Sequence, residues 1–98
     1  MQGQVTVIAF HRAKPGKEQE LREALLAVCA PTRKEKGCIN YDLHVSPDDP
    51  AVLVFHENWV SKADLDAHLH SPHIDSFRRR APDLLAEPPK LTLWSRLD

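Results

Sequence analysis

The sequence has little excess charge, few cysteines and no long hydrophobic run, and each deficit excludes a class of protein. Its 98 residues carry 13 Lys and Arg against 14 Asp and Glu, for a net charge of −1. This balance argues against a nucleic-acid-binding protein. No apolar stretch approaches the roughly 20 residues that cross a bilayer. Residues 1–4 lack the basic start and apolar run of a signal peptide. We therefore expect a cytoplasmic protein that binds neither nucleic acid nor membrane.

The chain also lacks the motifs that bind common cofactors. It contains no glycine-rich dinucleotide loop, no flavin motif and no phosphate-binding loop. Its two cysteines, Cys29 and Cys38, do not have the C-x-x-C spacing of a redox pair. We interpret both as small buried hydrophobic residues in a reducing compartment. No cofactor is expected.

Hydrophobic periodicity predicts four strands within one domain that covers residues 1–98. The stretches 4–12, 38–46, 52–60 and 90–97 are each typical of a strand, in which successive side chains point to opposite faces. Turn residues between Ser46 and Pro50 join the second strand to the third as a hairpin. The strands carry apolar residues on both faces, so both faces of the sheet are expected to be covered.

Two helical regions lie between these strands, over residues 17–34 and 61–84. The first has Leu21, Ala24, Leu25 and Val28 at helical spacing. Pro31 predicts a kink or a tightened last turn there, because its ring displaces the carbonyl four residues earlier. In the second region, Ser61 and Asp64 resemble a capping box, and Ser71-Pro72 is a second helix start.

The order of elements is strand, helix, strand, strand, helix, strand. Right-handed crossovers place both helical regions on one side of the sheet. The predicted fold is α+β and ferredoxin-like, βαββαβ, with a four-stranded antiparallel sheet. The other sheet face would be an adhesive apolar patch if it were open to water. A second copy packed sheet against sheet would cover it, and we predict a homodimer.

Several segments match one known family. They include Ala13–Glu18 before the first helix, Ala30–Arg33 at its end, and Gly37-Cys38 with Tyr41–His44 in the second strand. The most specific are Glu57-x-Trp59 and the run from Ala67 to His73, AHLHSPH. With these segments the chain resembles, over nearly its whole length, the antibiotic biosynthesis monooxygenase family of dimeric α+β barrels.

The resemblance implies a monooxygenase that acts on a quinol, an anthrone or a similar electron-rich aromatic without metal or flavin. In such oxidoreductases a base removes a proton from the substrate, and the resulting anion is reducing enough to give an electron to molecular oxygen. The protein supplies a pocket, a base and oriented polar groups. The expected partners are a small aromatic substrate and oxygen.

His68 is the candidate catalytic base. An unperturbed imidazole pKa of about 6.5 suits proton transfer at neutral pH. The residue lies on the Leu65 and Leu69 side of its helix, which faces the sheet. The alternative is a core histidine bonded to a backbone carbonyl.

Five further residues are candidates for substrate binding: Trp59, Tyr41, Phe55, Glu57 and His73. The two aromatic residues Phe55 and Trp59 share a strand face and could wall an aromatic ligand, or simply pack in the core. A buried carboxylate is costly when unpaired, so Glu57 should orient a histidine or meet an arginine. Tyr41 could direct its phenol at the substrate, whereas His73 could instead lie in solvent.

A metal site is not expected. His11, His44 and His56 lie on three strands without the H-x-H or H-x-x-x-H spacing of ligand pairs. His68 and His73 are five residues apart, the wrong phase for one helix face, and a helix break separates them.

Other functions remain as alternatives. An isomerase or tautomerase would use the same base without oxygen, and a non-catalytic small-molecule-binding module would show no turnover. A haem-degrading oxygenase of the same barrel type is disfavoured, because His68 replaces its tryptophan and Phe77 or Arg78 replaces its ligating histidine. An RNA-binding domain of this topology is disfavoured because residues 52–60 lack the ribonucleoprotein motifs.

Overall fold

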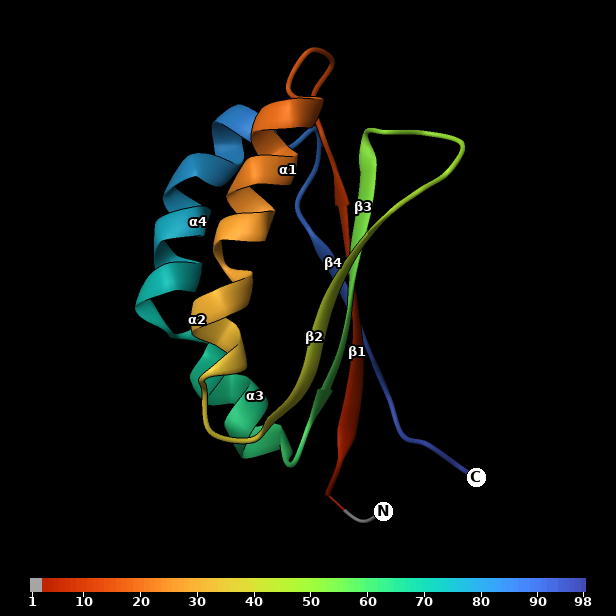
Figure 1. The fold of residues 1–98 in the computed structure, drawn as a ribbon, viewed down its shortest axis with the longest axis vertical. Coiled ribbons are helices and arrows are strands. Elements are labelled where there is room, and N and C mark those ends of the chain that lie inside the picture. The colour runs from red at the N-terminus through yellow and green to blue at the C-terminus, as the bar shows by residue number, and fades with distance from the viewer. Residues whose placement is uncertain (1–2) are drawn as a thin grey trace.

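The computed structural model describes residues 3–98 as one four-stranded sheet with helices on one face (Figure 1). The strands are β1 (Val5–Arg12), β2 (Cys38–Val45), β3 (Val52–Trp59) and β4 (Lys90–Trp94). The helices are α1 (Glu18–Ala27), α2 (Cys29–Arg33), α3 (Lys62–Leu69) and α4 (Pro72–Leu84). The strand order is β2-β3-β1-β4, and every neighbouring pair is antiparallel. The predicted ferredoxin-like α+β fold is confirmed.

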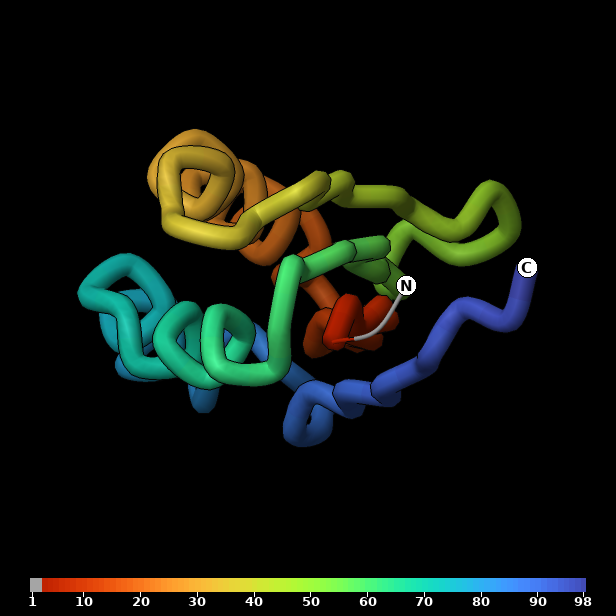
Figure 2. Tube along the Cα trace, turned by 90° about the horizontal axis from the view of Figure 1, so that it is seen from below, coloured from red at the N-terminus to blue at the C-terminus, as the bar shows by residue number. Residues whose placement is uncertain are grey.

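The helices form two columns on the same side of the sheet. Figure 2 looks along the strands and shows α1 with α2 beside α3 with α4. The first helical region is interrupted at one residue, Val28, between α1, which ends at Ala27, and α2, which begins at Cys29; the Val28 N–H bonds to the Leu25 carbonyl at 3.3 Å, a tightened turn of the kind expected there. Proline has no N–H to donate and its ring crowds the carbonyl four residues earlier, so Pro31 disrupts the helix at Ala27. The break therefore lies one turn before the proline.

The two helix starts predicted in residues 61–84 are present. Ser61 is the N-cap of α3, and its Oγ accepts a hydrogen bond of 3.1 Å from the backbone N–H of Asp64. Pro72 is the first residue of α4, where its missing N–H removes no helical hydrogen bond. Between them, His70 and Ser71 interrupt the helix, and this break determines where His73 lies.

The inward sheet face carries the core. It consists of alternate residues of β1 and β3 together with Tyr41 of β2, and they pack against Leu21, Leu25, Leu65 and Phe77 of the helices. The strand β4 is shorter than predicted, and its inward-facing residues Leu91 and Leu93 remain 40% and 45% exposed. The helices thus cover β1, β2 and β3 but leave the β4 edge partly open.

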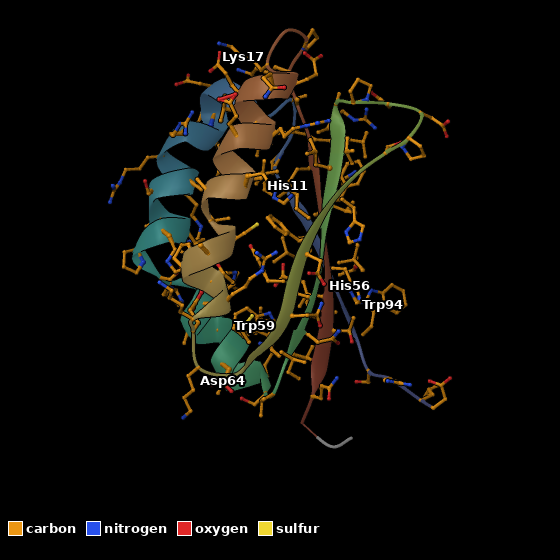
Figure 3. The ribbon with its side chains drawn as sticks, in the orientation of Figure 1. His11, Lys17, His56, Trp59, Asp64 and Trp94 are labelled. Atoms are coloured by element: carbon orange, nitrogen blue, oxygen red, sulfur yellow. The ribbon has the colours of Figure 1, made fainter. Side chains whose placement is uncertain are left out.

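The outward sheet face is mixed rather than uniformly apolar. Ile8, Phe10 and Val54 lie on it beside a polar row in which the Asn58 amide donates to Asn40 Oδ1 at 2.8 Å. His56 and Trp94 also lie on the side away from the helices (Figure 3), and Trp94 is 58% exposed. No helix within residues 3–98 is both long and apolar enough to cross a membrane.

Candidate functional site

A cavity of about 280 Å³ lies between the sheet and the helices. Most of its wall is apolar, and the polar side chains in it belong to His11, Tyr41, Glu57, His68 and Arg78. The remaining lining residues come from strands, helices and the segments that join them: Ala9, Leu25, Val28, Phe55, Leu69, Ile74, Phe77, Ala81, Pro89 and Leu91. An apolar hollow with a few convergent polar groups is the usual form of a small-molecule site.

His68 lies on α3 and is 2% exposed. Its Nδ1 is 2.7 Å from Oε2 of Glu35, and its ring packs against Trp59 with centroids 4.7 Å apart. A carboxylate can only accept a hydrogen bond, so Nδ1 carries the proton and the lone pair remains on Nε2. This is the tautomer that a general base requires.

Two opposing effects act on the His68 imidazole. Burial lowers its pKa below the ordinary value of 6.5, and the hydrogen bond and negative charge of Glu35 act in the opposite direction. Because the pKa is lowered, the imidazole is neutral at pH 7 and can accept a proton. The structure thus places His68 where the sequence predicted it, facing the sheet beside a cavity.

Glu35 is the site residue that sequence reasoning missed. It lies in the turn between α2 and β2, where its N–H donates to the Thr32 carbonyl at 3.0 Å and its carbonyl accepts from Cys38 N–H at 3.2 Å. Gly37 ends this turn with a φ of +82°. A position inside a charged run, KEKG, gave no signal, because such runs usually lie in solvent.

His73 shares the same carboxylate. Its Nε2 is 2.9 Å from Oε2 of Glu35, and its ring centroid is 6.1 Å from that of His68. The expectation that helical phase would separate the two histidines is wrong, because the break at His70 and Ser71 turns His73 back toward Glu35. His73 itself lies outside the wall of the cavity.

These three residues could also hold a metal ion. One donor atom each from Glu35, His68 and His73 lies within 4.8 Å of the others. Two histidines and a carboxylate form a common zinc ligand set. Here, however, the carboxylate oxygen is already at hydrogen-bonding distance from both rings, so the geometry is that of a hydrogen-bonded chain.

Glu57 has a different partner from the one expected. It meets neither a histidine nor an arginine: its Oε1 accepts a hydrogen bond of 2.9 Å from Nε1 of Trp59. Burial raises the Glu57 pKa from 4.5 to about 7, and the Trp59 hydrogen bond only partly offsets this effect. A neighbouring indole N–H is compatible with a neutral acid, whereas an arginine would have held the carboxyl ionised.

Of the three aromatic candidates, two line the cavity and the third lies behind His68. Phe55 and Tyr41 line the cavity and stack with centroids 4.2 Å apart. Burial raises the pKa of the Tyr41 phenol far above its usual range, so it remains protonated and can donate a hydrogen bond. Trp59 is fully buried behind His68 and does not line the cavity; Figure 3 shows it between sheet and helices.

His11 is the remaining polar residue of the inner wall. It is 6% exposed, and its Nδ1 has no hydrogen-bond partner. From the sequence, this histidine is a candidate only for a metal ligand. The alternation of Val5, Val7 and Ala9 on one strand face, extended by two residues, would have placed it facing the helices.

Comparisons with known proteins agree on one family. The sequence profile described as "Antibiotic biosynthesis monooxygenase" matches residues 4–80. The Escherichia coli protein named "Probable quinol monooxygenase YgiN" is 36% identical over 85 residues, which cover 74% of this chain and 80% of that protein.

Two solved structures share the whole fold. PA3566 from Pseudomonas aeruginosa has a TM-score of 0.94 at 35% identity and covers 100% of this chain and 98% of its own. Rv0793 from Mycobacterium tuberculosis has a TM-score of 0.90 at 39% identity and covers 97% of this chain and 96% of its own.

Proposed function

This chain belongs to the antibiotic biosynthesis monooxygenase family, and on that premise we propose that it is a monooxygenase of electron-rich aromatic substrates. The substrate is a quinol, an anthrone or a related hydroxylated ring, and the oxidant is molecular oxygen. The name of the Escherichia coli relative supports the quinol class. The observation that carries the proposal is the buried His68–Glu35 pair beside an apolar cavity.

In the first step, Nε2 of His68 accepts the proton of a substrate hydroxyl. Glu35 holds the ring and stabilises the imidazolium that forms, because its carboxylate is 2.7 Å from Nδ1. The bound substrate is left as an anion, and the apolar wall keeps water away from it. Glu57 and Tyr41 can donate hydrogen bonds to the negative oxygen.

Oxygen chemistry follows on the substrate anion. The anion gives one electron to oxygen, and the resulting superoxide and substrate radical combine at a ring carbon to form a peroxide. Cleavage of the peroxide bond leaves one oxygen atom on the ring as a carbonyl. The second oxygen atom leaves as water with the hydrogen of that carbon and the proton held by His68.

The direct test is oxygen uptake with a panel of quinols and anthrones. Wild type should consume oxygen, and His68→Ala should lose at least about a hundredfold in kcat, the usual size of a general-base contribution. His70→Ala is the matched control, since His70 is an exposed histidine at the end of the same helix. Equal rates for wild type and His68→Ala would refute the role of His68.

The same assay separates the alternatives. An isomerase or tautomerase would convert the substrate without consuming oxygen. A non-catalytic binding module would show no turnover, and His68→Ala would bind the ligand with unchanged affinity.

We also propose that the chain acts as a homodimer that covers the outward sheet face. Ile8, Phe10 and Val54 provide an apolar centre on that face, and the exposed Trp94 lies at its β4 edge. Burial of such a patch against a second copy would supply stability that a chain of this size has little room to obtain alone.

A further inference from the structure

The carboxylate of Glu35 joins two histidines from separate helices. Its Oε2 lies 2.7 Å from Nδ1 of His68 on α3 and 2.9 Å from Nε2 of His73 on α4. One donor atom from each of the three residues lies within 4.8 Å of the others. Figure 1 shows the turn between α2 and β2, which carries Glu35, beside α3. Three segments that are distant in the sequence thus bring two nitrogens and one oxygen together.

This set of atoms suits zinc. Two imidazole nitrogens and one carboxylate oxygen form a common zinc ligand set, with water in the fourth position. Zinc binds such atoms tetrahedrally at about 2.0–2.2 Å, so its ligands lie about 3.3 Å from one another. Oε2 of Glu35 would have to move away from each nitrogen by only about 0.5 Å. The side chain can make this adjustment, because it projects from a turn and is 18% exposed. Magnesium and calcium prefer oxygen ligands, so the two nitrogens disfavour both ions.

A metal ion at this point would change the tautomer of His68. A neutral imidazole carries one proton on two nitrogens, and it can offer either nitrogen to a metal by holding its proton on the other. In the hydrogen-bonded chain, Nδ1 of His68 carries the proton and donates to Glu35. Zinc on Nδ1 would place that proton on Nε2. The ring would then have no lone pair with which to accept a proton from the substrate.

The metal ligands can be reached without passing through the substrate cavity. His68 lines that cavity, whereas Glu35 and His73 do not. The Glu35 and His73 side chains are 18% and 19% exposed, and that of His68 is 3% exposed. A cation from solvent would therefore meet Glu35 and His73 first. The positive Arg78 in the cavity wall is paired with Asp75 at 3.0 Å, which limits its repulsion of such a cation.

We propose that Glu35, His68 and His73 form an inhibitory zinc-binding site. Zn²⁺ replaces the hydrogen bonds of the chain and binds Oε2 of Glu35, Nδ1 of His68 and Nε2 of His73, with water as its fourth ligand. The binding of zinc is independent of the proposed function. The inhibition rests on that function, because it follows from the loss of the His68 base. The cavity itself stays open, so zinc lowers kcat and leaves KM nearly unchanged.

Calorimetry with zinc chloride on protein without an affinity tag tests the site in the absence of substrate. Wild type should bind one zinc ion per chain, and magnesium chloride should give no binding signal. His73→Ala should weaken zinc binding at least about a hundredfold, the upper range for loss of a group that only supports a ligand. His70→Ala is the matched control, because His70 is an exposed histidine at the end of α3. Its zinc affinity should equal that of wild type.

Cadmium NMR on nitrogen-labelled wild type gives a second measurement that needs no variant. One-bond couplings should join cadmium to Nδ1 of His68 and to Nε2 of His73, and Nε2 of His68 should carry a proton. Three results would overturn the proposal: no zinc binding by wild type, an unchanged affinity in His73→Ala, or couplings to other nitrogens.

Oxygen uptake tests the inhibitory role separately. Saturating zinc should lower the kcat of wild type about a hundredfold, the size expected for loss of a general base, and a chelator should restore it. Uptake that persists with the site fully occupied would overturn the inhibition. Zinc bound at the assigned atoms of a protein that consumes no oxygen even without zinc would support the metal site and refute the proposed function.

Discussion

Nδ1 of His68 lies 2.7 Å from Oε2 of Glu35, although 33 positions separate the two residues in the chain. One is on a helix over the sheet, and the other is in the turn that leads into β2. Glu35 is a positioning residue for His68, because its carboxylate fixes the tautomer that leaves Nε2 free to accept a proton.

The Glu35→Gln variant tests this positioning. It should lower kcat about ten- to a hundredfold, since an amide can direct either its oxygen or its NH₂ at Nδ1 and supplies no negative charge. It also removes the negative charge that raises the His68 pKa, so that the lowering of this pKa by burial becomes larger. A base is active above its pKa, so the acid limb of the pH–kcat profile should move to lower pH. A variant with a purely structural defect would lose activity without moving that limb.

Glu57→Gln should stabilise the protein at alkaline pH. The Glu57 pKa is 4.5 unfolded and about 7 in the fold, so the folded state holds its proton more tightly. Wild type therefore loses about 3 kcal/mol as pH rises from 4.5 to above 7. Glutamine keeps an oxygen acceptor for the Trp59 indole and does not titrate. Urea unfolding at pH 4.5 and 8.5 should show the advantage of the variant only at the higher pH.

The stability of His11→Phe relative to wild type should rise as the pH falls, whereas that of Glu57→Gln should rise as the pH increases. The His11 pKa is 6.5 unfolded and about 4 in the fold, so the unfolded chain takes up the proton first. Wild type loses stability as pH falls from 6.5 to 4, by about 3 kcal/mol from this residue. The difference in unfolding free energy between variant and wild type should therefore grow as pH is lowered. A constant difference between pH 7 and pH 4 would contradict the neutral, buried state of His11.

Gly37→Ala should destabilise the turn that carries Glu35. The Gly37 φ is +82°, and an added Cβ would collide with the Asp64 side chain, which accepts a hydrogen bond from the Ser61 hydroxyl. We expect a loss of about 1–3 kcal/mol in unfolding free energy together with reduced oxygen uptake.

Gly16→Ala is the matched control for this prediction. The Gly16 φ is +84°, and nothing lies within 4 Å of its added Cβ. This variant should lose only about 1 kcal/mol, from backbone strain, and should keep its activity. Equal effects of the two substitutions would show that the contact with Asp64 is unimportant.

Ile8→Glu should convert the proposed dimer to a monomer. Ile8 lies on the outward face near the centre of the sheet, where it pairs with His56 and Thr92. A carboxylate there would be buried against the second copy. Light scattering should report a halved mass. Leu26→Glu, on the exposed side of α1, should leave the mass unchanged. A monomeric wild type would refute the dimer itself.

The sequence predicted the fold because its signals are local. Strand alternation, the Ser61 cap and the Pro72 helix start each act within a few residues, and together they determine the order of elements. The prediction was less accurate where tertiary packing determines whether a side chain is buried. Strict alternation puts Ile39 on the same face as the buried Tyr41, yet Ile39 is 52% exposed, and the pairing of β2 with β3 is irregular between Cys38 and Asn40.

The candidate site was predictable only in part for a related reason. His68 and Phe55 follow from the inward faces of a helix and a strand, which periodicity reveals. Glu35 belongs to a turn, where no periodicity exists, and its meeting with His68 depends on how two distant segments pack. The contact of His73 with Glu35 depends on the angle between α3 and α4 at the helix break. The spacing of residues along the sequence does not predict this angle.

The turn that holds Glu35 lies outside every helix and strand and is only partly buried. A substitution of Glu35 would remove the carboxylate bonded to the His68 ring without replacing a strand residue or a buried apolar side chain of the core. Under the proposed function, the reactivity of His68 would therefore change through this single position while the backbone stays the same.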